Sequence, residues 1–206
     1  RVIQEQGPSL LVDAPPLPAL EQLDVKDEGR VRRDLVRHAT LAVRRVGWHR
    51  DERALAEQEV EVLRTLDHPG IVRYYEHFVA DDSLCVVMAY CEGGDLARVI
   101  KQRADRGDFF SEGEILDWFV QIVMALHHIH TKRILHRDVK LENLLVTTAI
   151  SPQIKLCDFG HSCLIESAGV HAPCTADSFR GTEGYQAPEI SHGPNWSPAA
   201  DVFSAG

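Results

Sequence analysis

The sequence lacks any long apolar run, and this absence narrows the kinds of protein it can encode. A membrane-spanning helix needs about 18 consecutive apolar residues, and no run within the 206 residues approaches that length. The first residues, 1–5, are polar, so we expect no secretory signal peptide. We therefore expect no membrane insertion.

Metal-type cysteine pairs are also missing. The five cysteines are odd in number and show no such spacing: Cys85, Cys91, Cys157, Cys163 and Cys174. This usage indicates reduced thiols and a cytoplasmic or nuclear setting. Two zinc sites remain as alternatives, one among His127, His128 and His130 and one among Cys157, His161 and Cys163. Helix-end histidines and buried thiols are the simpler explanation of both groups.

A surplus of positive charge is absent as well. The chain carries 31 acidic and 22 basic side chains, a formal net charge of −9, which argues against a nucleic-acid binder with a basic surface. Hydrophobic residues make up 44% and charged residues 26%, as in globular rather than disordered chains. The 206 residues are enough for one or two domains with a buried core. Neither end resembles a natural terminus, so we expect a fragment.

The first third of the chain is rich in predicted strands. Residues 1–20 contain four prolines and are expected to form a tail or linker. Alternating apolar residues predict a strand over 40–46. A helix is predicted over 51–66, and Glu59 falls on its apolar stripe. A carboxylate on a buried face needs a cation, whereas one at the edge of the stripe is solvated, and the pattern leaves both alternatives open.

The remainder is predicted to be mainly helical. Further strands are expected over 71–78, 83–90, 144–146 and 153–156. Ser111 and Glu114 have the spacing of a capping box, which opens a long amphipathic helix. Its inward-facing residues are expected to be Ile115, Phe119, Ile122, Val123, Leu126 and Ile129. A long loop rich in small and polar residues follows Gly160, and loops of such length are usually functional or mobile.

Three short motifs carry the chemistry. The sequence reads HRDVKLEN over 136–143, DFG over 158–160 and GTEGYQAPE over 181–189. In this order and spacing they resemble the catalytic loop, the magnesium-binding motif and the end of the activation segment of eukaryotic protein kinases. The resemblance covers 23–206 and implies an α+β, two-lobed protein kinase-like fold, truncated at its C-terminus. It implies a small β-rich lobe at 21–90 and a mainly helical lobe at 91–206.

The resemblance implies a protein serine/threonine kinase that uses ATP and Mg²⁺. Asp138 would accept the proton of the substrate hydroxyl, and Lys140 would neutralise the transferring phosphate. Asn143 and Asp158 would supply hard oxygen ligands to Mg²⁺. Lys140 together with Thr182 resembles the serine/threonine branch of the family. From the pattern alone, loop-capping polar residues are the alternative for Asp138, Asn143 and Asp158.

The adenine and ribose positions follow from the same resemblance. Residues 88–91 resemble the gatekeeper and hinge, so Met88, Tyr90 and Cys91 would meet adenine, in part through the backbone. Asp95 matches the position that often meets the ribose. The remaining residues of the adenine pocket would be Val31, Ala42 and Leu145.

The phosphate-binding positions depart from the family pattern. Arg44 stands where the family has a lysine, with Glu59 as its helix partner. An arginine keeps the ion pair, but its planar fork does not replace a compact ammonium. Of the glycine-rich loop only Gly29 remains, although Lys26 or Arg30 could supply the missing charge. The alternative function is therefore a pseudokinase, a scaffold or binding module with impaired use of ATP.

Within the superfamily, four segments resemble the NIMA-related kinases, namely 59–63, 68–72, 90–96 and 115–122. By analogy alone, this implies a cytoskeletal, ciliary or nuclear location besides the cytoplasmic one. The implied partners are protein substrates. The sequence leaves their identity and the oligomeric state open. Asp201 resembles the aspartate that braces the catalytic loop in the family.

Arg137 and Ser178 predict control by phosphorylation. In the family, the arginine beside the catalytic aspartate binds a phosphate on the activation segment. Ser178 stands three residues before Gly181, with Thr175 as second choice and an ordinary loop serine as the alternative. We expect Ser178→Ala to lower the phosphorylation rate, because the loop loses charge-assisted bonds to Arg137. Full activity in this variant contradicts the idea, and Thr175→Ala tests the second choice in the same assay.

Overall fold

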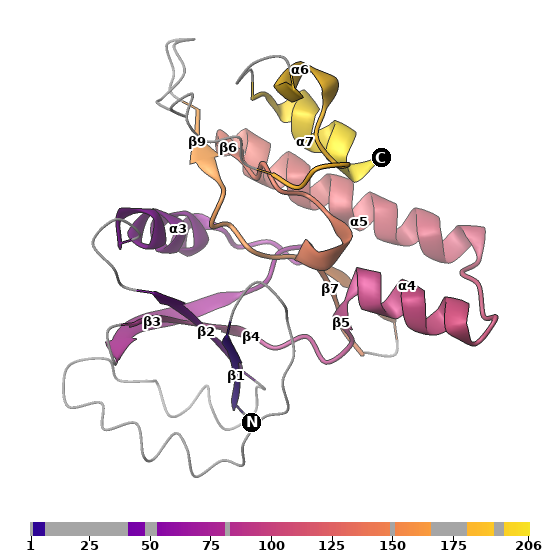
Figure 1. Cartoon of the computed structure of the whole chain (residues 1–206), viewed down its shortest axis with the longest axis horizontal. Helices are drawn as coiled ribbons and strands as arrows, with labels where there is room; N and C mark the ends of the chain where they lie inside the picture. The colour runs from indigo at the N-terminus through magenta and orange to yellow at the C-terminus, as the bar shows by residue number, and fades with distance from the viewer. Residues whose placement is uncertain are drawn as a thin grey trace. The chain divides into compact units, whose positions relative to one another are not determined.

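The computed structural model describes residues 2–6, 41–47, 53–80, 83–148, 151–165, 181–191 and 196–206 (Figure 1). The chain divides into two compact units. The first comprises Arg1–Thr65 and Val72–Cys91, and the second comprises Leu66–Ile71 and Glu92–Gly206. Several expectations lie outside the described residues, namely those on the glycine-rich loop with Lys26, Gly29, Arg30 and Val31, and those on Cys174, Thr175 and Ser178. Within the described residues, no helix is long and apolar enough to cross a membrane.

The first unit contains a four-stranded sheet in the order β1-β2-β4-β3. Its strands are β1 (Val2–Gln6), β2 (Leu41–Gly47), β3 (Tyr74–Ala80) and β4 (Ser83–Ala89). Strand β1 runs parallel to β2, and the other pairs are antiparallel. The sequence predicts a tail or linker over 1–20, yet β1 lies inside that span. Its five residues precede Pro8, so no proline removes a backbone N–H from this part of the sheet.

Strands β2 and β4 build the core of the first unit. Val43, Cys85 and Val87 form a buried cluster, against which three residues of β3 pack, namely Tyr75, Phe78 and Ala80. A helix of this unit, α3 (Arg53–Thr65), buries Val62 and Leu63 on one side. Glu59 is buried with them, so the sequence placed this carboxylate correctly on the apolar stripe.

The second unit joins short strands to helices. One sheet has the order β5-β7-β8, formed by β5 (Gly94–Asp95), β7 (Leu144–Val146) and β8 (Ile154–Leu156). A second pairs β6 (Ile134–Leu135) with β9 (Cys163–Leu164). The helices are α4 (Leu96–Asp105), α5 (Glu112–Thr131), α6 (Pro188–Ser191) and α7 (Pro198–Ala205), with a 3₁₀ turn at Leu141–Asn143. Helix α5 contacts β6, β8 and α7, which places it at the centre of this unit (Figure 1).

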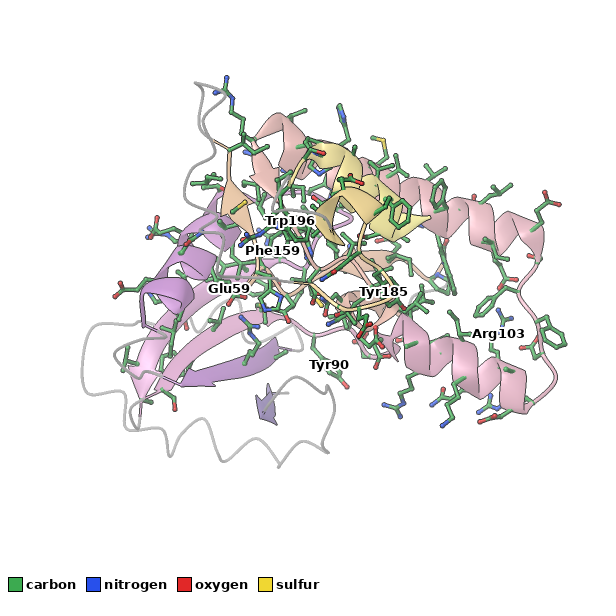
Figure 2. All side chains as sticks on the ribbon, turned by 45° about the horizontal axis from the view of Figure 1, so that its top comes forward. Glu59, Tyr90, Arg103, Phe159, Tyr185 and Trp196 are labelled. Atoms are coloured by element: carbon green, nitrogen blue, oxygen red, sulfur yellow. The ribbon has the colours of Figure 1, made fainter. Side chains whose placement is uncertain are left out.

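The start of α5 confirms the predicted capping box. The Ser111 side chain accepts the Glu114 N–H, and the Glu114 carboxylate accepts the Ser111 N–H. Arg103 of α4 donates to Glu114 and Asp108 at 2.9 Å each and lies 4.1 Å from the centre of the Phe110 ring (Figure 2). The hydrogen bonds from Ser111, followed by the one from Arg103, lower the pKa of Glu114 to about 2. This network therefore fixes the connection between α4 and α5.

The predicted inward face of α5 is only half correct. Ile122, Leu126 and Ile129 are buried. Ile115, Phe119 and Val123 were expected inward, but their side chains are 54%, 42% and 41% exposed. The apolar stripe continues over the whole helix, whereas in the described part of the chain it is covered only toward the C-terminal end. Periodicity identifies an apolar face but not the element that covers it.

Two glycines offer a matched test of packing in the second unit. A Cβ on Gly93 would lie 2.6 Å from the Val146 carbonyl oxygen, whereas a Cβ on Gly113 would meet no atom within 4 Å. We expect Gly93→Ala to lower the free energy of unfolding by about 1–3 kcal/mol through overpacking. Gly113→Ala should raise it by about 0.5–1 kcal/mol, because alanine is the better helix former. Urea unfolding measures the change in the free energy of unfolding for both variants. Equal changes would contradict the tight packing at Gly93 and the open space at Gly113.

Candidate active site

Residues 136–143 form a buried loop between β6 and β7. Asp138 and Asn143 are only 5% and 4% exposed. Arg137 adopts a φ of 68°, in the left-handed region that residues other than glycine rarely occupy. Such a conformation costs about 1–3 kcal/mol and persists only where its surroundings enforce it.

Asp201 supplies that enforcement. This residue of α7 is 1% exposed, and its carboxylate accepts the backbone N–H groups of His136 at 2.9 Å and Arg137 at 2.8 Å. His130 Nε2 lies 2.8 Å from the same carboxylate. The bracing role expected for Asp201 is therefore confirmed by its contacts.

The buried His136 side chain is fully hydrogen-bonded in its neutral form. Its Nδ1 accepts the Asp138 backbone N–H at 3.3 Å, so Nε2 carries the hydrogen that bonds the Cys157 carbonyl at 3.0 Å. Burial lowers the pKa of His136, which favours this uncharged form. The ring of Phe159, labelled in Figure 2, packs edge-on against it at 4.9 Å between centroids. The loop and the 158–160 motif are thus held together.

Asp138 is the centre of a network of donors. Its Oδ1 accepts the Thr182 hydroxyl at 2.8 Å. Its Oδ2 accepts Asn143 Nδ2 at 3.0 Å and lies 2.8 Å from Lys140 Nζ. Lys140 also donates to the Thr182 hydroxyl at 2.8 Å. The structure therefore brings together four residues that the sequence singled out: Asp138, Lys140, Asn143 and Thr182.

These neighbours keep Asp138 ionised. Burial alone would raise the pKa of Asp138, but the His161, Lys140 and Thr182 side chains outweigh burial and hold the pKa well below the ordinary carboxyl range. Asp138 is therefore a permanent acceptor at physiological pH. From the sequence, His161 was considered only as a zinc ligand, and its link to Asp138 was missed. Its position directly after the 158–160 motif was the available signal.

Asn143 and Asp158 lie at the same end of the β7–β8 ladder. The Cys157 N–H, next to Asp158, donates to the Asn143 carbonyl at 3.0 Å. The Asn143 amide nitrogen is bonded to the backbone and carboxylate oxygens of Asp138, so the amide oxygen is the atom of this side chain that could face a cation. Asp158 has a φ of 61°, and its carboxylate accepts the Gly160 N–H at 3.3 Å. Two oxygen ligands so placed fit Mg²⁺, which takes few protein ligands and retains waters.

The zinc alternatives are not supported. In the part of the chain that the structure describes, no three His, Cys, Asp or Glu side chains group closely enough to hold a metal ion. His128 instead stacks on His68 with ring centroids 4.9 Å apart, and His130 bonds Asp201. Cys157 and Cys163 are buried, and neither forms a disulfide bond.

The candidate nucleotide residues fall in both units. In the first, Arg44 forms an ion pair with Glu59, whose side chain is 5% exposed, and Ala42 pairs with Met88 in the β2–β4 ladder. Tyr90 is half-buried and Cys91 is buried. The residues in the second unit are Asp95, Leu145 and Asp158. Asp95 pairs with Leu145 in the β5–β7 ladder, and its side chain caps α4 by accepting the Arg98 N–H at 2.8 Å.

Arg137 contains an unsatisfied buried donor. Its side chain is 8% exposed, and Nε donates to the His161 carbonyl. The guanidinium lies 5.8 Å from the centre of the Trp196 ring. Among the described residues, the buried Nη1 atom has no hydrogen-bond partner. A buried guanidinium nitrogen of this kind is suited to an anion.

Comparison with known proteins matches residues 32–206 to the protein kinase domain. Serine/threonine-protein kinase Nek1 of Mus musculus is 41% identical over 155 residues, which are 75% of this chain and 12% of that protein. Nek3 of Mus musculus is 37% identical over 81% of the chain, and Nek8 of Danio rerio is 39% identical over 76%. The chain spans 31% of the length of Nek3 and 21% of Nek8.

The Asp201 brace can be tested by its removal. Asp201→Ala leaves two buried backbone N–H groups and His130 without their acceptor, at about 1–3 kcal/mol for each buried donor. We expect the free energy of unfolding to fall by about 3–5 kcal/mol. Urea unfolding measures this, with the exposed Asp117→Ala as matched control, expected within about 0.5 kcal/mol of the parent. A loss below about 1 kcal/mol for Asp201→Ala would refute the brace.

Proposed function

Because the chain belongs to the protein kinase family, with Nek serine/threonine kinases as its relatives, we propose that it transfers the γ-phosphoryl group of ATP to protein serine or threonine hydroxyls. The observation that carries the proposal is the network of Lys140, Asn143 and Thr182 around Asp138. Each member has a part in phosphoryl transfer, a reaction whose catalysis is mostly positioning and charge stabilisation.

Asp138 is proposed to orient the substrate hydroxyl and take its proton. Its depressed pKa makes it a weak base, but a reaction with a loose transition state needs little proton abstraction before the phosphoryl group has moved. Lys140, 2.8 Å from Asp138, places an ammonium group beside the acceptor. That charge would stabilise the transferring phosphoryl oxygens.

The proposed cofactor is Mg²⁺, held by Asn143 and Asp158. When bound there, the ion would supply positive charge that neutralises the negative charge of the phosphates. The chain's own contribution is to fix the ligand atoms. Asn143 is anchored to Asp138, and Asp158 follows the buried end of β8.

The proposed ATP contacts use the remaining candidates. Arg44, paired with Glu59, would meet the α- and β-phosphates. Asp95 would contact the ribose with the carboxylate that also caps α4. Adenine would meet the residues named from the sequence: Val31, Ala42, Met88, Tyr90, Cys91 and Leu145.

A binding module without phosphoryl transfer is the second candidate function. Arg44 favours it, because its guanidinium is already committed to the buried Glu59 carboxylate and differs in shape from a lysine ammonium. The two candidates differ in their chemistry but not in their fold. Activity is therefore the property that separates them.

The proposed organisation is a tail or linker at 1–20 that includes strand β1, an N-terminal lobe at 21–90 and a C-terminal lobe at 91–206. Protein substrates are the proposed partners, and a cytoplasmic, cytoskeletal, ciliary or nuclear location follows by analogy with the relatives. Arg137 is the proposed receptor for a phosphate on Ser178, because its buried Nη1 has no partner among the described residues.

Replacing the proposed base separates the two functions. We expect Asp138→Asn to lower Mg²⁺-dependent phosphoryl transfer by about 10²–10⁴-fold, because the amide cannot accept the hydroxyl proton. The measurement is incorporation of γ-phosphate into a generic protein substrate. The exposed Asp117→Asn is the matched control, and far-UV circular dichroism checks folding. Equal transfer by Asp138→Asn and the parent would contradict the kinase proposal and leave the binding module as the remaining candidate function.

A further inference from the structure

The turn at 66–71 packs closely against α5, which belongs to the same compact unit. Gly70 is buried, and a Cβ on it would lie 3.1 Å from the Gln121 carbonyl oxygen and 3.2 Å from the Ala125 Cβ. The Gly70 carbonyl accepts the Leu156 N–H of β8 at 2.8 Å. Contacts this close leave the turn little room to adjust, so it either packs against α5 or separates from it.

His68 holds the turn through an acceptor that a proton removes. Its Nδ1 atom accepts the backbone N–H of Gly70 at 3.0 Å. A ring nitrogen accepts only while it carries no hydrogen, so this bond needs the neutral imidazole, with its hydrogen on Nε2. The imidazolium carries a hydrogen on both nitrogens, and the Gly70 N–H would then lose this acceptor. Because a buried N–H without an acceptor is costly, protonation of His68 opposes the packed turn.

His128 of α5 adds a second imidazole to the same contact. Its ring stacks on that of His68 with the centroids 4.9 Å apart and an angle of 29° between the ring planes. Two imidazolium rings at this separation repel each other. In the part of the chain that the structure describes, the buried Nε2 atom of His128 has no hydrogen-bond partner, so a charged ring would find no acceptor at this nitrogen. The stack therefore suits two neutral rings.

The charges that face His68 also favour its neutral form. Lys155 of β8 donates from Nζ to the Pro69 carbonyl, which holds an ammonium group at the turn. Burial, followed by the charges of His128 and Lys155, lowers the pKa of His68. The direction agrees with the role of Nδ1 as an acceptor.

The surroundings of His128 act in the same direction. Burial, followed by the charge of Lys132, lowers the pKa of His128. Asp67 opposes this shift, and His127 adds a further repulsion. Because Asp67 is exposed, solvent screens its attraction for an imidazolium. The carboxylate therefore does not compensate the repulsive charges.

We propose that the 66–71 turn packs against α5 while His68 and His128 are neutral and separates from it when the two rings take up protons. A histidine in the unfolded chain titrates near pH 6.5, roughly its unperturbed value. In the folded chain both pKa values are lowered, so the stability that the packed turn contributes is present above about pH 6.5 and is lost as the pH falls below it. This inference concerns the second unit alone and does not depend on phosphoryl transfer.

Hydrogen exchange measures the separation directly. The readout is the protection factor of the Gly70 and Leu156 amides, which is the exchange rate of an unstructured chain divided by the measured rate, so the ordinary pH dependence of exchange cancels. We expect both factors to fall by about tenfold or more from about pH 7.5 to about pH 5.5, as for the loss of one buried hydrogen bond.

The Leu126 amide, in the buried part of α5, is the internal control and should keep its protection. Unchanged protection of Gly70 and Leu156 at the two pH values would overturn the proposal. An equal fall at Leu126 would also overturn it, because the whole unit would then be opening.

Two variants at histidines make the exchange experiment specific. His68→Asn keeps a side-chain oxygen that can accept the Gly70 N–H, but it has no group that titrates in this pH range. We expect its protection factors to be the same at both pH values. His127→Asn, at an exposed neighbouring position, is the matched control and should respond like the parent. A fall in His68→Asn as large as that in the parent would assign the effect to other groups and overturn the proposal.

Thermal unfolding tests the same proposal without assigned amides. Between about pH 7.5 and about pH 5.5, Tm of the parent should fall by about 2–4 °C more than Tm of His68→Asn. His128→Phe keeps an uncharged ring in the stack and should remove part of the same fall. If His68→Asn does not fold, the comparison of the parent with His128→Phe decides. Equal falls in Tm for the parent and the folded variants would overturn the proposal.

Discussion

The candidate site depends on one buried carboxylate, that of Asp201. It accepts backbone N–H groups of two adjacent residues, His136 and Arg137, that lie far earlier in the chain. Arg137 occupies a left-handed conformation, with a φ of 68°. A strained conformation is retained when its contacts over-determine it, and two hydrogen bonds from a residue that is 1% exposed meet that condition. The course of the 136–143 loop is thus fixed by a carboxylate of α7 as well as by the loop's own sequence.

The side chains of His136 and Asp138, which follow from this braced backbone, form a connected series of hydrogen bonds. His136 bonds the Cys157 carbonyl and receives the Asp138 N–H, so the ring joins the loop to the end of β8. Asp138 then gathers Lys140, Asn143 and Thr182. Burial increases the free-energy cost of losing any one hydrogen bond in such a network, because the remaining polar group is left desolvated and without a partner. The resulting low pKa of Asp138 is a consequence of the positioning of its donors.

The sequence predicted the parts of the fold and site that depend on local pattern. Family match and structure confirm the α+β, two-lobed kinase fold, and the capping box at Ser111 was also correct. For Glu59 the pattern gave the apolar stripe and left open whether the carboxylate is buried, which the structure shows it to be. The motifs at 136–143, 158–160 and 181–189 were recognisable because residue types and their spacing are visible in the sequence. The exposure of Phe119 was not predictable, because periodicity gives the apolar side of α5 but not what lies against it. His161 was missed because its role depends on a contact with a residue far from it in sequence.

The energetics of the loop bear on the choice between an enzyme and a binding module. A module that only binds needs neither Arg137 in a left-handed conformation nor four polar side chains converging in a buried loop. A residue in such a conformation costs about 1–3 kcal/mol, and each buried donor must be matched by an acceptor. Arg44 departs from the lysine of the family pattern, but it still forms the ion pair with Glu59. The strain and the donors that converge on Asp138 are what positioning of a reacting hydroxyl requires, and they support the proposed phosphoryl transfer.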